Sequence, residues 1–391
     1  MVTREDIREL AQFQATLPDA CALSFYFQPG APQDKSHRSD AIQVKDLVRD
    51  AMRESQKHGK NACARGDLER ILDVVGSLGA NQRHAKAIFA CKSLNFWREF
   101  DLPPQLAKTQ LVVNRRFDLR PLAILLGAHP RLCVTLVDRQ RARFFDLRLD
   151  QLTEGEGIFH KLPRAKNYGF KGYDAGHAER RIADDALHHF KNVADRLKDE
   201  FERGIWEKLI VGCNDSIWSE FEAQLHTYVK QRLLGHFPID VASATPEEVR
   251  SLGARVLRRS IEERGQRLLD DTLSFARANG RGVTGLRRVL NAVESGEAQT
   301  LFLSDSYSAK AVECTNCGHI DSHMIPACVA CGQATRELED VCEALIPIAI
   351  RRDIELFYLK KQPALDQVGN IAAMLRYRMD TTRAGQNSLA S

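Results

Sequence analysis

The sequence lacks any long apolar run. No stretch approaches the roughly 18 to 20 consecutive apolar residues that a membrane-spanning helix needs. The longest candidate, PLAILLGA, has the length of a buried strand or a short helix. The first residues, MVTREDIREL, are charged and helical in pattern, so they do not form a signal peptide. We therefore expect a cytoplasmic protein with no membrane contact.

The chain also carries little net charge, since 56 Lys and Arg against 52 Asp and Glu leave only +4 over 391 residues. That charge is unevenly spread, because the stretch 161–181 alone has a net charge of +4. Its acidic residues are Asp174 and Glu179, and its basic residues are Lys161, Arg164, Lys166, Lys171, Arg180 and Arg181. Such a segment is either a solvated loop or a loop that follows the phosphates of a nucleic acid.

Four of the ten cysteines form two CxxC pairs, Cys314 with Cys317 and Cys328 with Cys331. A glycine follows each pair and allows the tight turn that a metal knuckle needs. Four thiolates suit tetrahedral zinc, and a complete set of protein ligands leaves no open position for catalysis. We therefore predict a structural zinc ion (Zn2+) in a small ribbon over residues 313–333, although His319 or His323 could replace one thiolate.

The remaining cysteines are scattered through apolar or helical stretches. In a reducing compartment they are expected to be small buried hydrophobic residues rather than disulfides. They are Cys21, Cys63, Cys91, Cys133, Cys213 and Cys342.

Hydrophobic patterning predicts an α/β protein of three domains, each a mixed sheet with flanking helices. Residues 1–128 form an N-terminal domain and residues 129–265 a middle domain. The middle domain contains a basic, glycine-rich loop over 153–181, and an amphipathic helix is expected after it from Ile182. Residues 266–391 form a C-terminal domain that carries the zinc insert.

Two segments of the last region, GVTGLRRVLNAVESGEAQTLFLS and VGNIAAMLRYRMD, resemble the C-terminal domain of archaeal and eukaryotic class-1 peptide-chain release factors and Pelota. The stretch DLRPLAILLGAHPRLCVTLVDRQRARFFDL resembles the entry into the middle domain in the bacterial branch of this superfamily. The resemblance extends over about residues 20–380. It implies three α/β domains and a site of action on the ribosome.

In release factors, the loop before the long middle-domain helix carries Gly-Gly-Gln, which positions a water molecule on the ester of peptidyl-tRNA. The matching stretch here is KGYDAGHAERR, and no Gly-Gly-Gln occurs anywhere in the chain. Tyr173 or His177 takes the place of the glutamine, while Gly172 and Gly176 allow close approach to RNA. The codon-reading motif Asn-Ile-Lys-Ser is missing from residues 1–128. The resemblance therefore does not imply a stop-codon reader.

The resemblance implies that this segment contacts 23S rRNA in the ribosomal A site and that elongation factor Tu is a possible partner. The expected RNA-binding residues are Lys161, Arg164, Lys166, Lys171, Gly172, Tyr173, Gly176, His177, Arg180 and Arg181. A protein that blocks the A site of idle ribosomes without releasing peptide would be a hibernation factor, active in translation regulation under stress. We assign no catalytic residue on this hypothesis.

Two other hypotheses remain open. In the first, the protein is a peptidyl-tRNA hydrolase that rescues stalled ribosomes, with His177 near Asp174 and Glu179 as the general base. In the second, it kept the fold without a ribosomal role. The neighbouring His188 and His189 are expected to be surface residues rather than a metal-binding pair.

Overall fold

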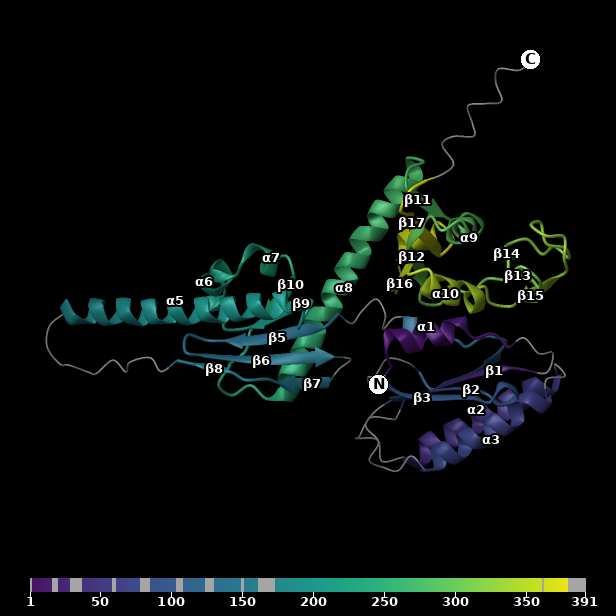
Figure 1. Cartoon of the computed structure of the whole chain (residues 1–391), viewed down its shortest axis with the longest axis horizontal. Coiled ribbons are helices and arrows are strands. Elements are labelled where there is room, and N and C mark those ends of the chain that lie inside the picture. The colour runs from purple at the N-terminus through teal and green to yellow at the C-terminus, as the bar shows by residue number, and fades with distance from the viewer. Residues whose placement is uncertain are drawn as a thin grey trace, which may run out of the picture. The chain divides into compact units, whose positions relative to one another are not determined.

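The structure is a computed structural model that describes ten ranges of the chain: 2–15, 20–28, 37–57, 61–77, 85–102, 108–123, 130–148, 151–160, 173–360 and 362–378. The chain divides into two compact units (Figure 1). The N/C unit comprises residues 1–127 together with 265–391, and the middle unit comprises residues 128–264. The division into three domains remains a prediction.

The first sheet of the N/C unit has the strand order β3-β2-β1-β4. Its strands are β1 (Ala22–Phe27), β2 (Ala85–Cys91), β3 (Phe96–Leu102) and β4 (Gln110–Asn114). All its pairings are antiparallel, so the predicted mixed sheet is wrong for this part of the chain. The reason lies in the connection between β1 and β2. Two helices, α2 (His37–Lys57) and α3 (Asn61–Ser77), return the chain to the end at which β1 finished.

Strand β1 is buried along its whole length because both faces of the sheet are covered. Leu23 and Phe25 pack on one face with Val48 of α2 and Leu68 of α3. Tyr26, on the opposite face, meets the ring of Phe89 edge-on at 5.8 Å. Successive side chains of a strand point to opposite faces, so β1 contributes to two apolar layers.

The middle unit contains a mixed sheet with the strand order β10-β9-β5-β6-β7, in which β8 also pairs with β6. Strands β5, β9 and β10 are parallel, and the pairings of β6 are antiparallel. A hairpin turn around Arg139 joins β5 to β6. The strands are β5 (Leu132–Val137), β6 (Arg141–Arg148), β7 (Gln151–Glu154), β8 (Ile158–Phe159), β9 (Lys208–Gly212) and β10 (Leu233–Phe237).

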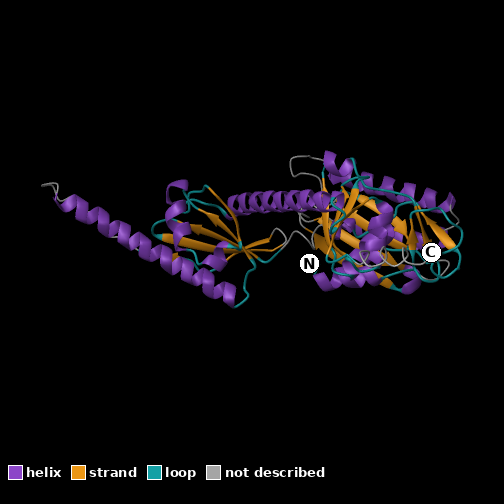
Figure 2. Ribbon diagram, turned by 90° about the horizontal axis from the view of Figure 1, so that it is seen from above, coloured by secondary structure: helices purple, strands orange, loops and turns teal. Residues whose placement is uncertain are grey.

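Helices cover both faces of this sheet (Figure 2). Cys133 and Val137 of β5 belong to the core formed with α5 (Tyr173–Glu202), α6 (Asp215–Gln224) and α7 (Thr227–Lys230). Leu132 and Leu136, which alternate with them, belong to the core formed with α8 (Pro246–Arg277). Because its side chains alternate between the two faces of the sheet, β5 contributes to both hydrophobic cores.

The basic loop predicted over 153–181 is shorter than expected. Thr153 lies in β7, and α5 begins at Tyr173 rather than near Ile182, so Gly176 and His177 are helical. The segment 173–181 is rich in Ala, Glu and Arg, which favour helix, and one interior glycine costs only about 1 kcal/mol. The packed half of α5 already provides the helix nucleus, and extending an existing helix costs little free energy per added turn.

A second sheet of the N/C unit is mixed, with the order β11-β17-β12-β16. Its strands are β11 (Gly282–Thr284), β12 (Ala298–Ser304), β16 (Glu355–Leu359) and β17 (Ile371–Leu375). The helices of this region are α9 (Leu286–Glu294), α10 (Cys342–Arg351) and α11 (Pro363–Asp366). Pro347 does not break α10, which continues through it to Arg351.

Most of the isolated cysteines are confirmed as buried free thiols, namely Cys91, Cys133, Cys213 and Cys342. Cys21 is buried but disulfide-bonded, so the expectation of no disulfides is wrong for this residue. Sequence alone does not show which thiols come within bonding distance. The side chain of Cys63 lies outside the described residues. Within the ranges that the structure describes, no helix combines the length and the apolar character needed to cross a bilayer.

Candidate metal centre

The cysteine-rich insert forms a small three-stranded antiparallel sheet with the order β14-β13-β15. Its strands are β13 (Ala311–Cys314), β14 (Ile320–Asp321) and β15 (Thr335–Leu338). We call residues 311–338 the ribbon. The first cysteine of the first pair ends β13, and the second pair lies in the connection from β14 to β15. The sheet therefore brings the two pairs together.

The four thiols converge on one point. All four Sγ atoms lie within 4.8 Å of one another. The Sγ atoms of Cys314 and Cys331 are 3.4 Å apart, and those of Cys317 and Cys328 are 3.7 Å apart. A tetrahedral zinc ion with Zn–S bonds of about 2.3 Å requires sulfur–sulfur separations of about 3.8 Å. The four residues can therefore hold one metal ion.

Each pair adopts the same turn. The N–H of Gly318 donates to the carbonyl of Cys314 at 3.2 Å, and the N–H of Gly332 donates to that of Cys328 at 2.9 Å. Both glycines have positive φ angles, 74° and 73°, in a region that disfavours any residue with a Cβ atom. The glycine after each pair is thus a conformational requirement of the knuckle.

Backbone amides also stabilise the thiolate form of the first ligand. The N–H groups of Cys317 and Asn316 donate to Cys314 Sγ at 3.5 and 3.4 Å. These donors, that of Cys317 foremost, lower the pKa of Cys314 to about 6. The thiolate is the form that binds metals, so these donors favour metal binding by Cys314.

Neither histidine of the ribbon is needed as a ligand. His319 Nδ1 lies 2.7 Å from Glu294 Oε2 of α9, and His323 Nδ1 lies 2.9 Å from Asp321 Oδ1. Across the described ranges, the four cysteines are the one group of three or more His, Cys, Asp or Glu residues close enough to share an ion. Four protein ligands leave no position for a substrate. The identity of the ion as zinc remains a prediction.

The predicted RNA-binding residues divide into two groups. Lys161, Arg164, Lys166, Lys171 and Gly172 lie outside the described residues. Tyr173, Gly176, His177, Arg180 and Arg181 belong to the first turns of α5, and their side chains lie outside the described part of the structure. Their grouping as one RNA-binding surface remains a prediction.

Two histidines flank the basic segment 161–181 in the sequence, His160 before it and His189 after it. His160 Nδ1 is 3.0 Å from His189 Nδ1 on α5, and Asn192 Nδ2 is 3.5 Å from His160 Nε2. His189 is fully buried, so its predicted place on the surface is wrong, whereas His188 is exposed as expected. Helical spacing explains this, since His189 shares a face with the buried Ala186. Burial lowers the pKa of His189.

An acidic pocket of about 600 Å³ in the middle unit was not predicted from the sequence. Asp138, Asp215 and Asp240 line it, and they follow the parallel strands β5, β9 and β10. The sequence does contain a signal for this pocket, because an aspartate follows each of these three buried strands. Asp138 Oδ1 accepts the N–H groups of Gln140 and Arg141, both at 2.7 Å, and Asp240 Oδ2 accepts the hydroxyl of Ser243 at 2.7 Å. Two of these aspartates therefore stabilise turns.

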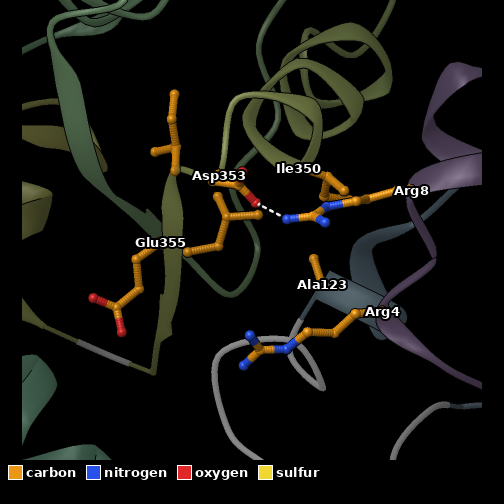
Figure 3. Close-up of a pocket in the computed structure, with 8 residues that line it drawn as sticks. Arg4, Arg8, Ala123, Ile350, Asp353 and Glu355 are labelled. Atoms are coloured by element: carbon orange, nitrogen blue, oxygen red, sulfur yellow. Dashed lines mark hydrogen bonds and ion pairs between the residues drawn. The ribbon is translucent and has the colours of Figure 1, made fainter.

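A second pocket, of about 290 Å³, lies in the N/C unit (Figure 3). Arg4 and Arg8 of α1 (Arg4–Gln12) line one side, and Asp353 and Glu355 line another. Arg8 and Asp353 form an ion pair at 2.5 Å between partly exposed side chains. Because charges of both signs line this pocket, its electrostatics favour neither an anion nor a cation.

The comparison with protein families agrees with the resemblance seen in the sequence. Residues 118–263 match the family model described as bacterial archaeo-eukaryotic release factor family 10. These residues are therefore similar to the bacterial branch of the release factor and Pelota superfamily, the branch that the sequence itself resembles. No curated protein matches the chain.

Solved structures of the superfamily are also similar to the chain, at low identity. An archaeal translation termination factor, aRF1, is 17% identical with a TM-score of 0.26, covering 96% of this chain and 99% of its own. Pelota from Archaeoglobus fulgidus is 12% identical with a TM-score of 0.37, covering 96% and 93%. Dom34 from S. cerevisiae, described as a translation termination-like factor, is 11% identical with a TM-score of 0.39, covering 78% and 82%.

Proposed function

We propose that this protein is a release-factor-like ribosome-binding factor that occupies the A site of idle ribosomes and inhibits translation there. The observation that carries the proposal is a match to a release-factor family over residues 118–263 in a chain without Gly-Gly-Gln. The matched range includes the whole basic segment 161–181. The protein would act in the cytoplasm as a hibernation factor, with elongation factor Tu as a candidate partner.

Electrostatics support contact between this segment and rRNA. Six basic side chains against two acidic ones give 161–181 a net charge of +4. Helix α5 begins inside the segment, at Tyr173. The first N–H groups of a helix and its macrodipole attract anions. Phosphate contacts of this kind position a protein on RNA without reading its sequence.

Co-sedimentation with 70S ribosomes at low and high salt tests this proposal. Wild type should pellet with ribosomes at low salt and be lost at high salt. The charge-reversal variant Arg180→Glu/Arg181→Glu should lose binding. The matched control, Arg258→Glu/Arg259→Glu, makes the same change in charge at an exposed pair of arginines on α8 and should still bind. Absence of wild-type binding at low salt would instead favour a protein without a ribosomal role.

The alternative is a peptidyl-tRNA hydrolase that acts on stalled ribosomes. The observation in its favour is His177, which lies between the acidic residues Asp174 and Glu179 in the same segment. Peptide release from stalled complexes, measured for wild type and His177→Ala, separates the two functions. We expect no release by either protein. Release by wild type that His177→Ala abolishes would establish the hydrolase and refute the inhibitor.

A further inference from the structure

A buried carboxylate in the ribbon links it to the N-terminal part of the chain. Glu313 is 2% exposed and Arg116, which follows β4, is 6% exposed. Arg116 binds Glu313 through both terminal nitrogens, Nη1 to Oε2 at 3.0 Å and Nη2 to Oε1. Arg336 of β15 donates to the same carboxylate through Nε at 3.0 Å and Nη2 at 2.5 Å. The buried carboxylate of Glu313 is therefore hydrogen-bonded to two guanidinium groups, which come from different parts of the N/C unit.

Each flank of the first metal knuckle makes a polar contact to the rest of the N/C unit. Glu313 directly precedes the ligand Cys314. On the other flank, Glu294 of α9 binds His319 Nδ1 at 2.7 Å and the N–H of Ile320 at 2.8 Å. The knuckle therefore lies between one contact to α9 and one to Arg116. A metal ion that holds the knuckle in this conformation would therefore also hold the residues that make these two contacts in place.

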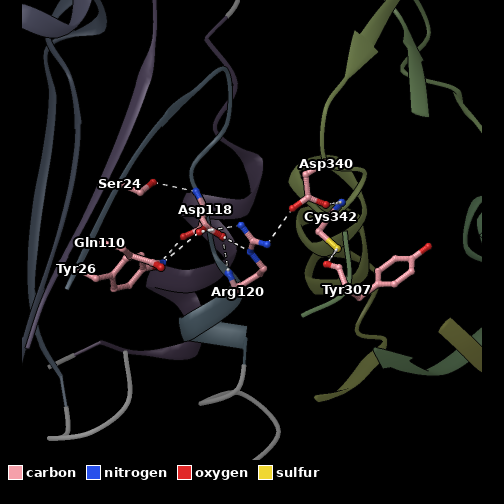
Figure 4. A network of polar contacts seen from close by, with 8 residues as sticks. All are labelled: Ser24, Tyr26, Gln110, Asp118, Arg120, Tyr307, Asp340 and Cys342. Atoms are coloured by element: carbon pink, nitrogen blue, oxygen red, sulfur yellow. Dashed lines mark hydrogen bonds and ion pairs between the residues drawn. The ribbon is translucent and has the colours of Figure 1, made fainter. Parts of the chain in front are cut away.

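A second polar network joins the same parts of the chain (Figure 4). Arg120 donates from Nε to Asp118 at 3.1 Å and from Nη1 to Asp340 at 2.9 Å. Asp340 also accepts the N–H of Cys342, at the start of α10, at 3.0 Å. Tyr26 anchors the N-terminal side, because its hydroxyl donates to the carbonyl of Asp118 at 2.6 Å. Asp340 lies two residues after the ribbon, so this network also depends on where the last ribbon strand ends.

We propose that the metal ion held by Cys314, Cys317, Cys328 and Cys331 is a latch that keeps residues 1–123 docked on residues 265–378. Small metal-dependent units lose their fold without the ion. Loss of the knuckle would move Glu313 away from Arg116. The buried guanidinium of Arg116 would then lack this carboxylate, which is strongly unfavourable. The docked N-terminal part would then open while the C-terminal sheet stays folded. This inference goes beyond the proposed function and does not depend on ribosome binding.

Hydrogen–deuterium exchange of the full chain, with metal content measured on the same samples, tests the latch. Cys317→Ser/Cys331→Ser replaces the two exposed ligands and should lose the metal. Peptides covering 4–12 and 110–118 should then exchange faster by about tenfold or more, since a buried ion pair is broken. The exchange rates of peptides covering β12 and β5 should stay unchanged. Adding zinc back after chelation of wild type should restore the slow exchange.

Two further variants separate the latch from a general loss of stability. Val329→Ser changes an exposed side chain between two ligands and should keep both the metal and slow exchange. Arg116→Met leaves Glu313 paired with Arg336 and should keep the metal while it accelerates exchange at 4–12. Metal loss without faster exchange at 4–12 would overturn the latch. An equal acceleration of exchange in β12 would also overturn it. So would an unchanged exchange rate at 4–12 in Arg116→Met.

Discussion

At the scale of single residues, the most consequential side chain is Glu313, a carboxylate held between two arginines. Burial alone would raise its pKa, but the hydrogen bonds and charge of Arg116, joined by those of Arg336, lower it instead. A lowered carboxylate pKa stabilises the fold above the ordinary value of 4.5, and the benefit is lost as the pH falls below that value.

Replacing this carboxylate should destabilise the N/C unit. Glu313→Gln leaves two guanidinium groups facing a neutral amide, and removing one partner of a buried ion pair costs about 3–5 kcal/mol. Urea unfolding at pH 7 measures the loss. Glu337→Gln, an exposed substitution on β15, should change the free energy of unfolding by only about 0–1 kcal/mol. Equal effects of the two variants would contradict the assigned role of Glu313.

The pair of His160 and His189 should make the middle unit sensitive to acid. Burial, and secondarily the neighbouring His160, lower the pKa of His189 from 6.5, while the backbone of Arg141 and the charge of Asp138 oppose the shift. A histidine with a lowered pKa stabilises the fold at neutral pH, and this stability is lost as the pH falls below 6.5.

Urea unfolding at pH 7 and pH 5 measures this sensitivity. The stability of wild type should decrease over this interval more than that of His189→Leu, whose side chain does not titrate. His188→Leu, at the exposed neighbouring position, should keep the pH dependence of wild type. An identical pH dependence in wild type and His189→Leu would contradict the prediction.

At the scale of elements, periodicity identified most helices and strands, while the ends depended on context. The helical pattern of MVTREDIREL is confirmed, since α1 begins at Arg4. Thr245 caps α8, with its Oγ1 accepting the N–H of Glu248 at 3.3 Å. The start of α5 was placed too late because glycine and charge suggest a loop, whereas a long packed helix can absorb both.

Glycine substitutions test the extended start of α5. Gly176→Ala should stabilise the middle unit by about 0.5–1 kcal/mol, because alanine favours a helix interior. Gly204→Ala, just after α5, should have the opposite effect, since Gly204 has a φ of 68° and αL costs about 1–2 kcal/mol for other residues. Thermal unfolding measures both changes. Destabilisation by Gly176→Ala would show that α5 begins later in solution.

At the scale of the whole molecule, the proposed contact with rRNA has a definite salt dependence. If all six basic side chains of 161–181 neutralise phosphates, the plot of log affinity against log salt should have a slope of about −4 to −5. Arg180→Ala/Arg181→Ala should reduce the magnitude of this slope by about 2, one for each lost phosphate contact. Titrations with labelled protein and ribosomes measure both. An unchanged slope in the variant would place these arginines outside the interface.

The sequence by itself determined the features that depend on local chemistry. Spacing fixed the two CxxC knuckles and their glycines, alternation fixed the strands, and the composition of 161–181 fixed its charge. Only the tertiary structure decided which distant groups meet. It set the antiparallel order of the first sheet, buried His189 beside His160, and bound Arg116 to Glu313 across 197 residues. The physical reason is that such pairings depend on how packed layers align, and local preferences carry no information about that alignment.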